Sequence, residues 1–152
     1  MYELRRITRH EYSWLTSEDF YNLFSQLTMC TLIDSSSFKT WFDEMINNPL
    51  FVLFGVIESF PNTPGVKLVG TGSMYIHSRY YRNGSKSAHL EDIVIDKNHR
   101  GKGLGKDLVE QMICYAQKNN CYKLQLACDL NLRPFYEKLK FKNHNNCMEY
   151  YL

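Results

Sequence analysis

Runs of apolar residues with two different patterns predict three strands in the first half of the chain. Across residues 2–8 apolar and polar positions alternate, as they do in a strand at the edge of a sheet. Residues 50–57 are continuously apolar, which indicates a buried strand. Residues 66–77 should form the next strand, with a bend or bulge where Gly70 and Gly72 interrupt it.

Two amphipathic helices are predicted between the first and second of these strands. Residues 16–19 (TSED) and 34–37 (DSSS) each resemble the capped start of a helix. Residues 47–49 (NNP) should end the second helix. The apolar faces are expected to be core rather than a cofactor site; they consist of Phe20, Leu23, Phe24 and Leu27, then Phe38, Trp41, Phe42, Met45 and Ile46.

Residues 88–119 give the clearest local pattern, a strand, a glycine-rich turn and a helix in succession. The other elements expected in this half are a polar loop at 79–87 that makes a hairpin with the strand at 90–96, a strand at 122–128, a short helix at 132–139 and a final strand at 141–152. No repeat or linker interrupts the order β-α-α-β-β-β-α-β-α-β. We therefore expect one domain over residues 1–152 with a sizeable core.

The turn before the central helix has the chemistry of an anion-binding site. Gly101, Gly103 and Gly105 alternate with larger residues directly after Arg100. Glycines let a ligand approach the backbone, and the first N–H groups of a helix and its dipole favour a phosphate or pyrophosphate. The same glycines could serve only to make a tight turn. The dinucleotide fingerprint and the Walker A loop both fail on spacing.

Three short motifs carry a resemblance to a known family. Arg100-x-x-Gly103-x-Gly105 resembles the turn with which the GNAT acetyltransferases hold the pyrophosphate of acetyl-CoA, and the segment FYEKLKF at 135–141 resembles the FYEKxGF ending of that superfamily. The segment EDIV at 91–94, together with CYK at 121–123, is narrower and resembles the glucosamine-6-phosphate N-acetyltransferases. The close resemblance covers residues 90–141.

This resemblance implies a fold, a reaction and partners. The fold would be the α/β GNAT fold, a mixed twisted sheet with helices on both faces. Acetyl-CoA would be the co-substrate, and the amine of D-glucosamine 6-phosphate would attack its thioester directly, a step of UDP-N-acetylglucosamine biosynthesis. The resemblance also implies a homodimer.

The resemblance implies site residues as well. Tyr136 would donate a hydrogen bond to the departing thiolate, although it could simply be a packed tyrosine. Glu91 would receive the proton of the amine through water, although it could be an ordinary surface carboxylate. Because Glu91 and Asp92 are adjacent on a strand, we expect their side chains to point to opposite faces. The implied cofactor-binding residues are Ile93, Val94, Ile95, Arg100, Gly101, Lys102, Gly103, Leu104, Gly105, Lys106, Asn131, Tyr136 and Lys138, and the implied substrate-binding residues are Leu27, Thr28, Glu91, Asp92 and Lys123.

At three positions that would bind the acceptor sugar, the sequence differs from the glucosamine-6-phosphate N-acetyltransferases. Ala127 stands where an acidic residue is usual, Leu132 stands where an asparagine is usual, and the C-terminal segment lacks the usual basic residue. The amides of residues 26–28 would meet the sugar phosphate at a helix end, and Lys123, Arg79, Arg82 and Arg133 could add positive charge. Two alternatives stay open. One is a GNAT enzyme for another amine, such as a peptide N-terminus, a lysine or a polyamine, and the other is a non-catalytic acyl-CoA-binding module.

Composition narrows the partners and the compartment. A net charge of +2 over 152 residues does not indicate a nucleic-acid or membrane partner. The sequence has no run of eighteen apolar residues, and its start does not resemble a signal peptide. The five cysteines form no C-x-x-C pair, so we expect reduced thiols in a cytoplasmic protein and no metal site.

Overall fold

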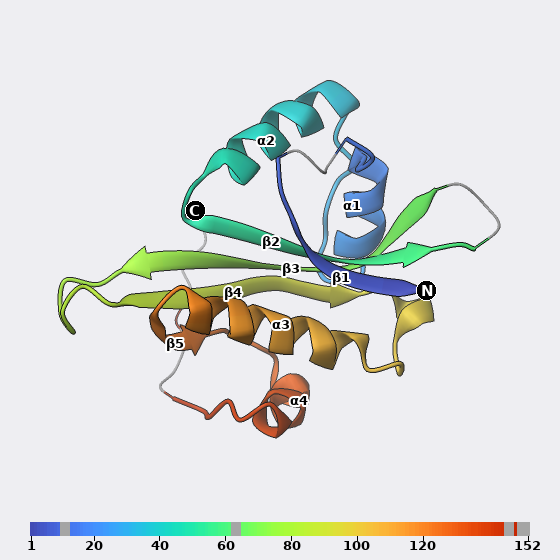
Figure 1. The fold of residues 1–152 in the computed structure, drawn as a ribbon. Helices are drawn as coiled ribbons and strands as arrows, with labels where there is room; N and C mark the ends of the chain where they lie inside the picture. The colour runs from blue at the N-terminus through green and yellow to red at the C-terminus, as the bar shows by residue number, and fades with distance from the viewer. Residues whose placement is uncertain (10–12, 62–64, 145–147, 149–152) are drawn as a thin grey trace.

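The computed structural model describes residues 1–9, 13–61, 65–144 and 148, and these fold around one mixed sheet (Figure 1). Its five strands are β1 (Tyr2–Ile7), β2 (Phe51–Ser59), β3 (Val66–Ser78), β4 (Lys86–Ile95) and β5 (Cys121–Gln125), in the spatial order β1-β2-β3-β4-β5. The first four pair antiparallel, and β5 runs parallel to β4. The predicted hairpin is confirmed, but β4 begins at Lys86 because residues 86–89 also pair with β3.

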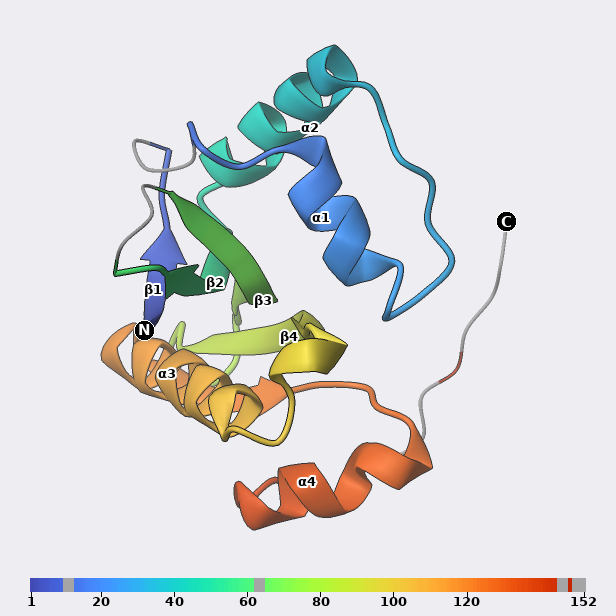
Figure 2. The same ribbon diagram turned by 90° about the vertical axis from the view of Figure 1, so that its right-hand side faces the viewer.

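Helices cover both faces of the sheet, as predicted (Figures 1 and 2). On one face lie α1 (Ser17–Phe24) and α2 (Ser35–Asn47). On the other face lie α3 (Leu104–Lys118) and the short α4 (Arg133–Lys138), and two 3₁₀ turns, η1 (Lys97–His99) and η2 (Leu130–Leu132), precede them. Thr16 and Asp19 form the predicted capping box of α1, and Asp34 caps α2 by accepting from the N–H groups of Ser36 and Ser37.

Two apolar cores flank the sheet. The core under α1 and α2 contains Phe20, Leu23, Phe38, Phe42 and Leu53, and the core under α3 and α4 contains Phe54, Met74, Leu108, Met112 and Tyr136. One prediction for the first helix is wrong. Leu27 is exposed because α1 ends at Phe24, where the chain turns and the Leu27 N–H donates to the Phe24 carbonyl.

A bulge bends β3 and β4 at the place that the glycines predicted. Thr71 pairs with Val94 but Ser73 pairs with Glu91, so Gly72 alone faces both Asp92 and Ile93. Asp92 takes up the extra residue with a left-handed φ of 55°. A Cβ on Gly72 would lie 3.0 Å from the sulfur of Met112, so a larger residue would require a small shift of that side chain. The bulge shifts the alternation of side chains along β4.

The predicted final strand does not begin at Phe141. Residues 141–144 belong to no strand, and residues 145–147 and 149–152 lie outside the described residues. The reason is local, because the chain closes α4 with a Schellman motif. The Lys140 N–H donates to the Glu137 carbonyl at 2.9 Å, and the Phe141 N–H donates to the Tyr136 carbonyl at 3.1 Å. Phe141 also contacts the Tyr136 ring, with 5.8 Å between centroids.

Candidate active site

The edge of the sheet opens between β4 and β5. These strands pair only from Lys86 to His89 on the β4 side, so residues 90–95 run on without a β5 neighbour. Asp96 donates its N–H across to the Val69 carbonyl of β3, and backbone groups alternate in direction along a strand. The N–H and C=O groups of Ile93 and Ile95 therefore face the open edge. Ile93 and Ile95 are two of the cofactor-binding residues that the resemblance implied, and the gap beside them has room for an extended ligand arm.

Two predicted residues of this strand have other partners. The Ile95 carbonyl accepts a hydrogen bond from Arg100 Nε at 2.9 Å, which ties the glycine turn to the gap. Val94 pairs with Thr71 of β3, and its side chain lies buried in the core under α1 and α2. The structure therefore places Ile93 and Ile95, but not Val94, at the gap.

The glycine turn has the conformation that its sequence predicted. Gly101 and Gly103 have φ angles of 78° and 83°, and nothing lies within 4 Å of the position that a Cβ would take on either. Gly103 is the N-cap of α3, and no side chain caps the helix there. The first N–H groups of a helix without a side-chain cap are open to an anion, and the dipole of this 15-residue helix favours one.

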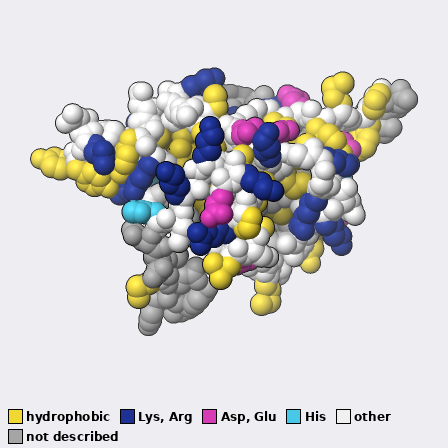
Figure 3. Space-filling view, turned by 90° about the horizontal axis from the view of Figure 1, so that it is seen from below, with side chains coloured by type: hydrophobic (Ala, Val, Ile, Leu, Met, Phe, Trp, Pro, Cys, Tyr) yellow, Lys and Arg dark blue, Asp and Glu magenta, His cyan; other side chains and the backbone are white. Residues whose placement is uncertain are grey.

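Basic side chains surround the turn. Lys102 Nζ donates to the Tyr2 hydroxyl at 2.6 Å, and Lys106 lies 3.6 Å from Glu110 on the surface of α3. Leu104 is buried, so it can offer a ligand only its backbone. The face formed by α3 and α4 carries many further Lys and Arg side chains (Figure 3). A polyphosphate at the turn would therefore meet a positive field.

Tyr136 lies in α4 with its ring buried between Phe135 and Phe141 and only 8% of its surface exposed. Burial raises the pKa of the Tyr136 phenol, and the nearby Cys128 raises it further. Tyr136 is thus a neutral hydrogen-bond donor, and its hydroxyl makes no hydrogen bond to any residue that the structure describes. The free donor and the buried ring fit the role that the resemblance implied.

Glu91 and Asp92 do not point to opposite faces, so that prediction is wrong. Leu90 belongs to the core under α3, whereas Glu91 and Asp92 both face the side of α1 and α2, because the bulge at Asp92 breaks the alternation. Tyr75 on the same face has a raised pKa, first from burial and then from the charges of Glu91 and Asp92. The two carboxylates therefore form a pair.

The members of the pair differ in their environment. Glu91 Oε1 lies 3.1 Å from His89 Nδ1, and both side chains are partly exposed. Asp92 Oδ2 accepts from the Ser73 hydroxyl at 3.4 Å. Although part of Asp92 faces solvent, burial raises the pKa of its carboxyl, and the charge of Glu91 raises it further. The carboxylate of Asp92 is therefore a stronger proton acceptor than an ordinary aspartate.

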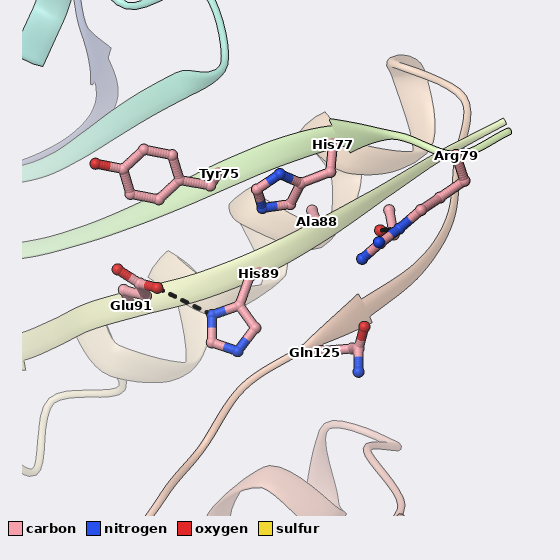
Figure 4. Close-up of a pocket in the computed structure, with 8 residues that line it drawn as sticks. Tyr75, His77, Arg79, Ala88, His89, Glu91 and Gln125 are labelled. Atoms are coloured by element: carbon pink, nitrogen blue, oxygen red, sulfur yellow. Dashed lines mark hydrogen bonds and ion pairs between the residues drawn. The ribbon is translucent and has the colours of Figure 1, made fainter. Parts of the chain in front are cut away.

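A polar cavity of about 360 Å³ opens on the Glu91 side of the pair (Figure 4). Figure 4 shows side chains from β3, β4 and β5 around it; they are Tyr75, His77, Arg79, Ser87, Ala88, His89, Glu91 and Gln125. Arg79 Nε donates to the Ser87 hydroxyl at 2.9 Å, which holds the guanidinium beside the cavity. Sequence reasoning missed the histidines, although the polar residues at every second position of 75–79 and 87–91 would have pointed to them.

A second cavity, of about 410 Å³, opens on the Asp92 side and is mostly apolar. Most of its lining comes from α1, α2 and the segment between them, and the strands add Phe51, Leu53, Ser73 and Asp92. The N–H groups of Leu27 and Thr28 both donate to the Phe24 carbonyl at 2.9 Å. They lie at the carboxyl end of α1, where the dipole is negative. In this arrangement both amides already donate within the chain, which does not favour a phosphate there.

Three other predicted binding residues, Asn131, Lys138 and Lys123, do not line either cavity, although Lys123 is half-buried and pairs with Ser87 at the edge of the polar one. Asn131 in η2 and Lys138 on α4 are exposed. Lys123 lies 5.6 Å from the ring centroid of Tyr122. The structure does not bring these three together with Glu91 and Asp92. Within the described ranges there is no group of three or more His, Cys, Asp or Glu residues that could hold a metal ion, and no helix long and apolar enough to cross a membrane.

Comparison with known proteins identifies relatives of this chain in sequence and in fold. Residues 4–141 match the Acetyltransferase (GNAT) family. The chain is 35% identical over 132 residues to glucosamine 6-phosphate N-acetyltransferase of Arabidopsis thaliana, covering 87% of each. The crystal structure of the glucosamine-6-phosphate N-acetyltransferase from Arabidopsis thaliana matches with a TM-score of 0.83 at 31% identity, over 99% of this chain and 98% of that one. An acetyltransferase of Trypanosoma brucei matches with a TM-score of 0.84 at 29% identity over the whole of both chains.

Proposed function

The chain belongs to the GNAT family of acetyltransferases, and we propose that it transfers the acetyl group of acetyl-CoA to the amine of D-glucosamine 6-phosphate. The observation that carries this proposal is the position of the carboxylate pair. Glu91 and Asp92 lie where β4 leaves β5, between the open strand edge and a polar cavity that holds an arginine. Similarity to curated enzymes of that name supports the choice of substrate.

The donor side is built by the turn and the open edge. The N–H groups at the start of α3 would hold the pyrophosphate, with Arg100, Lys102 and Lys106 adding charge. The backbone groups of Ile93 and Ile95 would align the pantetheine arm as a further strand does. Open space at Gly101 and Gly103 fits a ligand that approaches the backbone closely. Acetyl-CoA supplies a thioester that an amine can attack directly, so positioning by these groups accounts for much of the rate.

The acceptor amine must lose a proton before or during the attack. Asp92, with its raised pKa, is suited to hold the ammonium group and to take a proton from it. Glu91 would receive the proton through water and pass it to solvent on the His89 side. Asp92 would thus hold the amine and take its proton, and Glu91 would pass that proton on to solvent.

Tyr136 would act on the leaving group. A thiol has a reference pKa of about 8.5 and a tyrosine of about 10, so full proton transfer to the thiolate is uphill by about 2 kcal/mol. Burial raises the pKa of Tyr136, which makes the transfer harder still. The phenol therefore stabilises the departing sulfur by donating a hydrogen bond.

The phosphate of the sugar would lie in the polar cavity. Arg79 provides a fixed cation there, and His77 and His89 provide further donors (Figure 4). This set takes the place that Leu27 and Thr28 were expected to fill.

A homodimer, a cytoplasmic location and a place in UDP-N-acetylglucosamine biosynthesis form part of the same proposal. Exposed aromatic side chains at the β3–β4 hairpin, Tyr80 and Tyr81, support an intermolecular contact. Light scattering coupled to gel filtration measures the mass directly, and a dimer is the expected result.

A second acceptor class is favoured by one observation. The apolar cavity next to Asp92 is large enough for an amine with an apolar tail. Release of CoA thiol with glucosamine 6-phosphate, beside glucosamine, spermidine, 2-phenylethylamine and a lysine peptide, separates the candidates. The proposal expects saturable turnover with the phosphosugar and a raised KM for it alone in Arg79→Gln. Turnover of another amine only would overturn the substrate, and no turnover of any amine would leave an acyl-CoA-binding module.

A further inference from the structure

A buried histidine lies between two carboxylates directly before the glycine turn. His99 ends η1 and is only 9% exposed. Its Nε2 lies 3.1 Å from Glu58 Oε2, and its Nδ1 lies 3.3 Å from Asp96 Oδ1. Glu58 comes from β2, and Asp96 directly follows β4. One imidazole therefore joins two strands to the segment that leads into the turn.

The geometry constrains the charge of this ring. A carboxylate only accepts hydrogen bonds, and a neutral imidazole has a single N–H. Both contacts of His99 are hydrogen bonds only when the ring carries two N–H groups, that is, as imidazolium. Loss of the proton turns a lone pair toward one of the carboxylates, which is repulsive in a buried site.

Charged and hydrogen-bonding groups from several elements surround the ring. Burial opposes ionisation of Asp96, but hydrogen bonds from the Asn98 N–H, from His99 and from Gln26 outweigh burial and lower the pKa of that carboxyl. From β3, Lys67 lowers this pKa further. From β1, Tyr2 packs its ring edge-on to His99 at 6.0 Å, and its hydroxyl accepts from Lys102. The charged side chains here are thus two carboxylates against Lys67 and Lys102.

Short-range hydrogen bonds connect the His99–Glu58–Asp96 cluster to the glycine turn. Asp96 caps η1 by accepting from the Asn98 N–H at 2.8 Å. Arg100, the residue after η1, donates a hydrogen bond to the Ile95 carbonyl, and Lys102 donates one to the Tyr2 hydroxyl. Gly101 and Gly103 have no side chains to fix their own conformation, so the segment that precedes them sets the path of the turn.

We propose that protonated His99, held between Glu58 and Asp96, is a positioning residue that keeps the turn at residues 100–105 in its anion-binding conformation, so that affinity for CoA falls when His99 loses its proton. This inference rests on the proposed donor site, since the anion is the pyrophosphate of CoA. It does not depend on which amine is the acceptor.

The test measures CoA binding without turnover. Isothermal titration with CoA is carried out from pH ~6 to ~9 on the wild type, His99→Gln and the surface control His144→Gln. At low pH, His99→Gln should bind CoA about tenfold more weakly, the effect of one lost charge-assisted hydrogen bond. The wild type and His144→Gln should lose affinity as the pH rises, whereas His99→Gln should lack this component. Nitrogen NMR shifts of the His99 ring should show imidazolium at low pH and deprotonation over the same pH range.

A gentler variant guards against misfolding of His99→Gln. Glu58→Gln keeps an acceptor for Nε2 but removes one negative charge, so the loss of CoA affinity should occur at a lower pH than in the wild type. Equal affinities for the wild type and His99→Gln at every pH, or a neutral His99 ring at pH ~6, would overturn the proposal. A wild type that does not bind CoA would overturn it together with the donor site. If CoA affinity depends on His99 but glucosamine 6-phosphate is not turned over, only the proposed acceptor substrate is refuted.

Discussion

Gly103 offers a test of the donor site in which stability and binding separate. Its φ of 83° is left-handed, and open space surrounds the position of a Cβ. Gly103→Ala therefore costs only the backbone strain, about 1–2 kcal/mol. For a chain of this size, that lowers the melting temperature by about 2–8 °C. If the turn holds a pyrophosphate, the new methyl group stands in the path of the ligand and removes at least one charge-assisted hydrogen bond, worth about 1.5–3 kcal/mol. CoA should then bind about 10–100-fold more weakly.

Gly84 supplies the matched control. It has a φ of 72°, also with nothing within 4 Å of a Cβ, but it lies in the β3–β4 hairpin loop. Gly84→Ala should lower the melting temperature by a similar amount and leave CoA affinity unchanged. Calorimetric melting and isothermal titration with CoA measure both quantities. Equal CoA affinities for the two variants would refute the assignment of the turn.

Three further predictions concern single side chains. Tyr136→Phe removes a hydroxyl without a partner among the described residues, so the melting temperature should hold while kcat falls about 10–100-fold with KM for acetyl-CoA unchanged, as steady-state kinetics would show. Asp92→Asn should lower kcat/KM at least tenfold. Because the folded-state pKa of Asp92 is raised, its ionisation destabilises the fold above the ordinary pKa of about 3.9, so this variant should gain stability at pH ~7 but not at pH ~3 in urea unfolding. Lys140 has a left-handed φ of 69°, so Lys140→Gly should raise the free energy of unfolding by about 1 kcal/mol, and no gain would contradict the strain.

Much of the fold could be predicted because its signals are local. The caps of α1 and α2, the apolar run of β2 and the glycine spacing before α3 each depend on neighbours in sequence, and the structure confirms all of them. The final strand could not be predicted in the same way. Phe141 fits an apolar strand pattern, but its N–H closes α4 instead.

Only part of the active site could be predicted, because sequence patterns report contacts between neighbours in the chain and not between distant residues. The turn and Tyr136 stand in contiguous motifs. The pairing of Glu91 with Asp92 depends on a bulge opposite Gly72, and a two-residue period predicts the reverse. The contact of His99 with Glu58 joins residues 41 positions apart, so no local pattern indicates it.

Acetylation of an amino-sugar phosphate at the Glu91–Asp92 pair can be tested in solution. The most direct test is the rate of CoA thiol release with glucosamine 6-phosphate, compared with glucosamine under the same conditions. We expect saturable turnover of the phosphosugar, a much lower kcat/KM for glucosamine, and loss of this preference in Arg79→Gln. Equal turnover of both sugars, or turnover of neither, would contradict it.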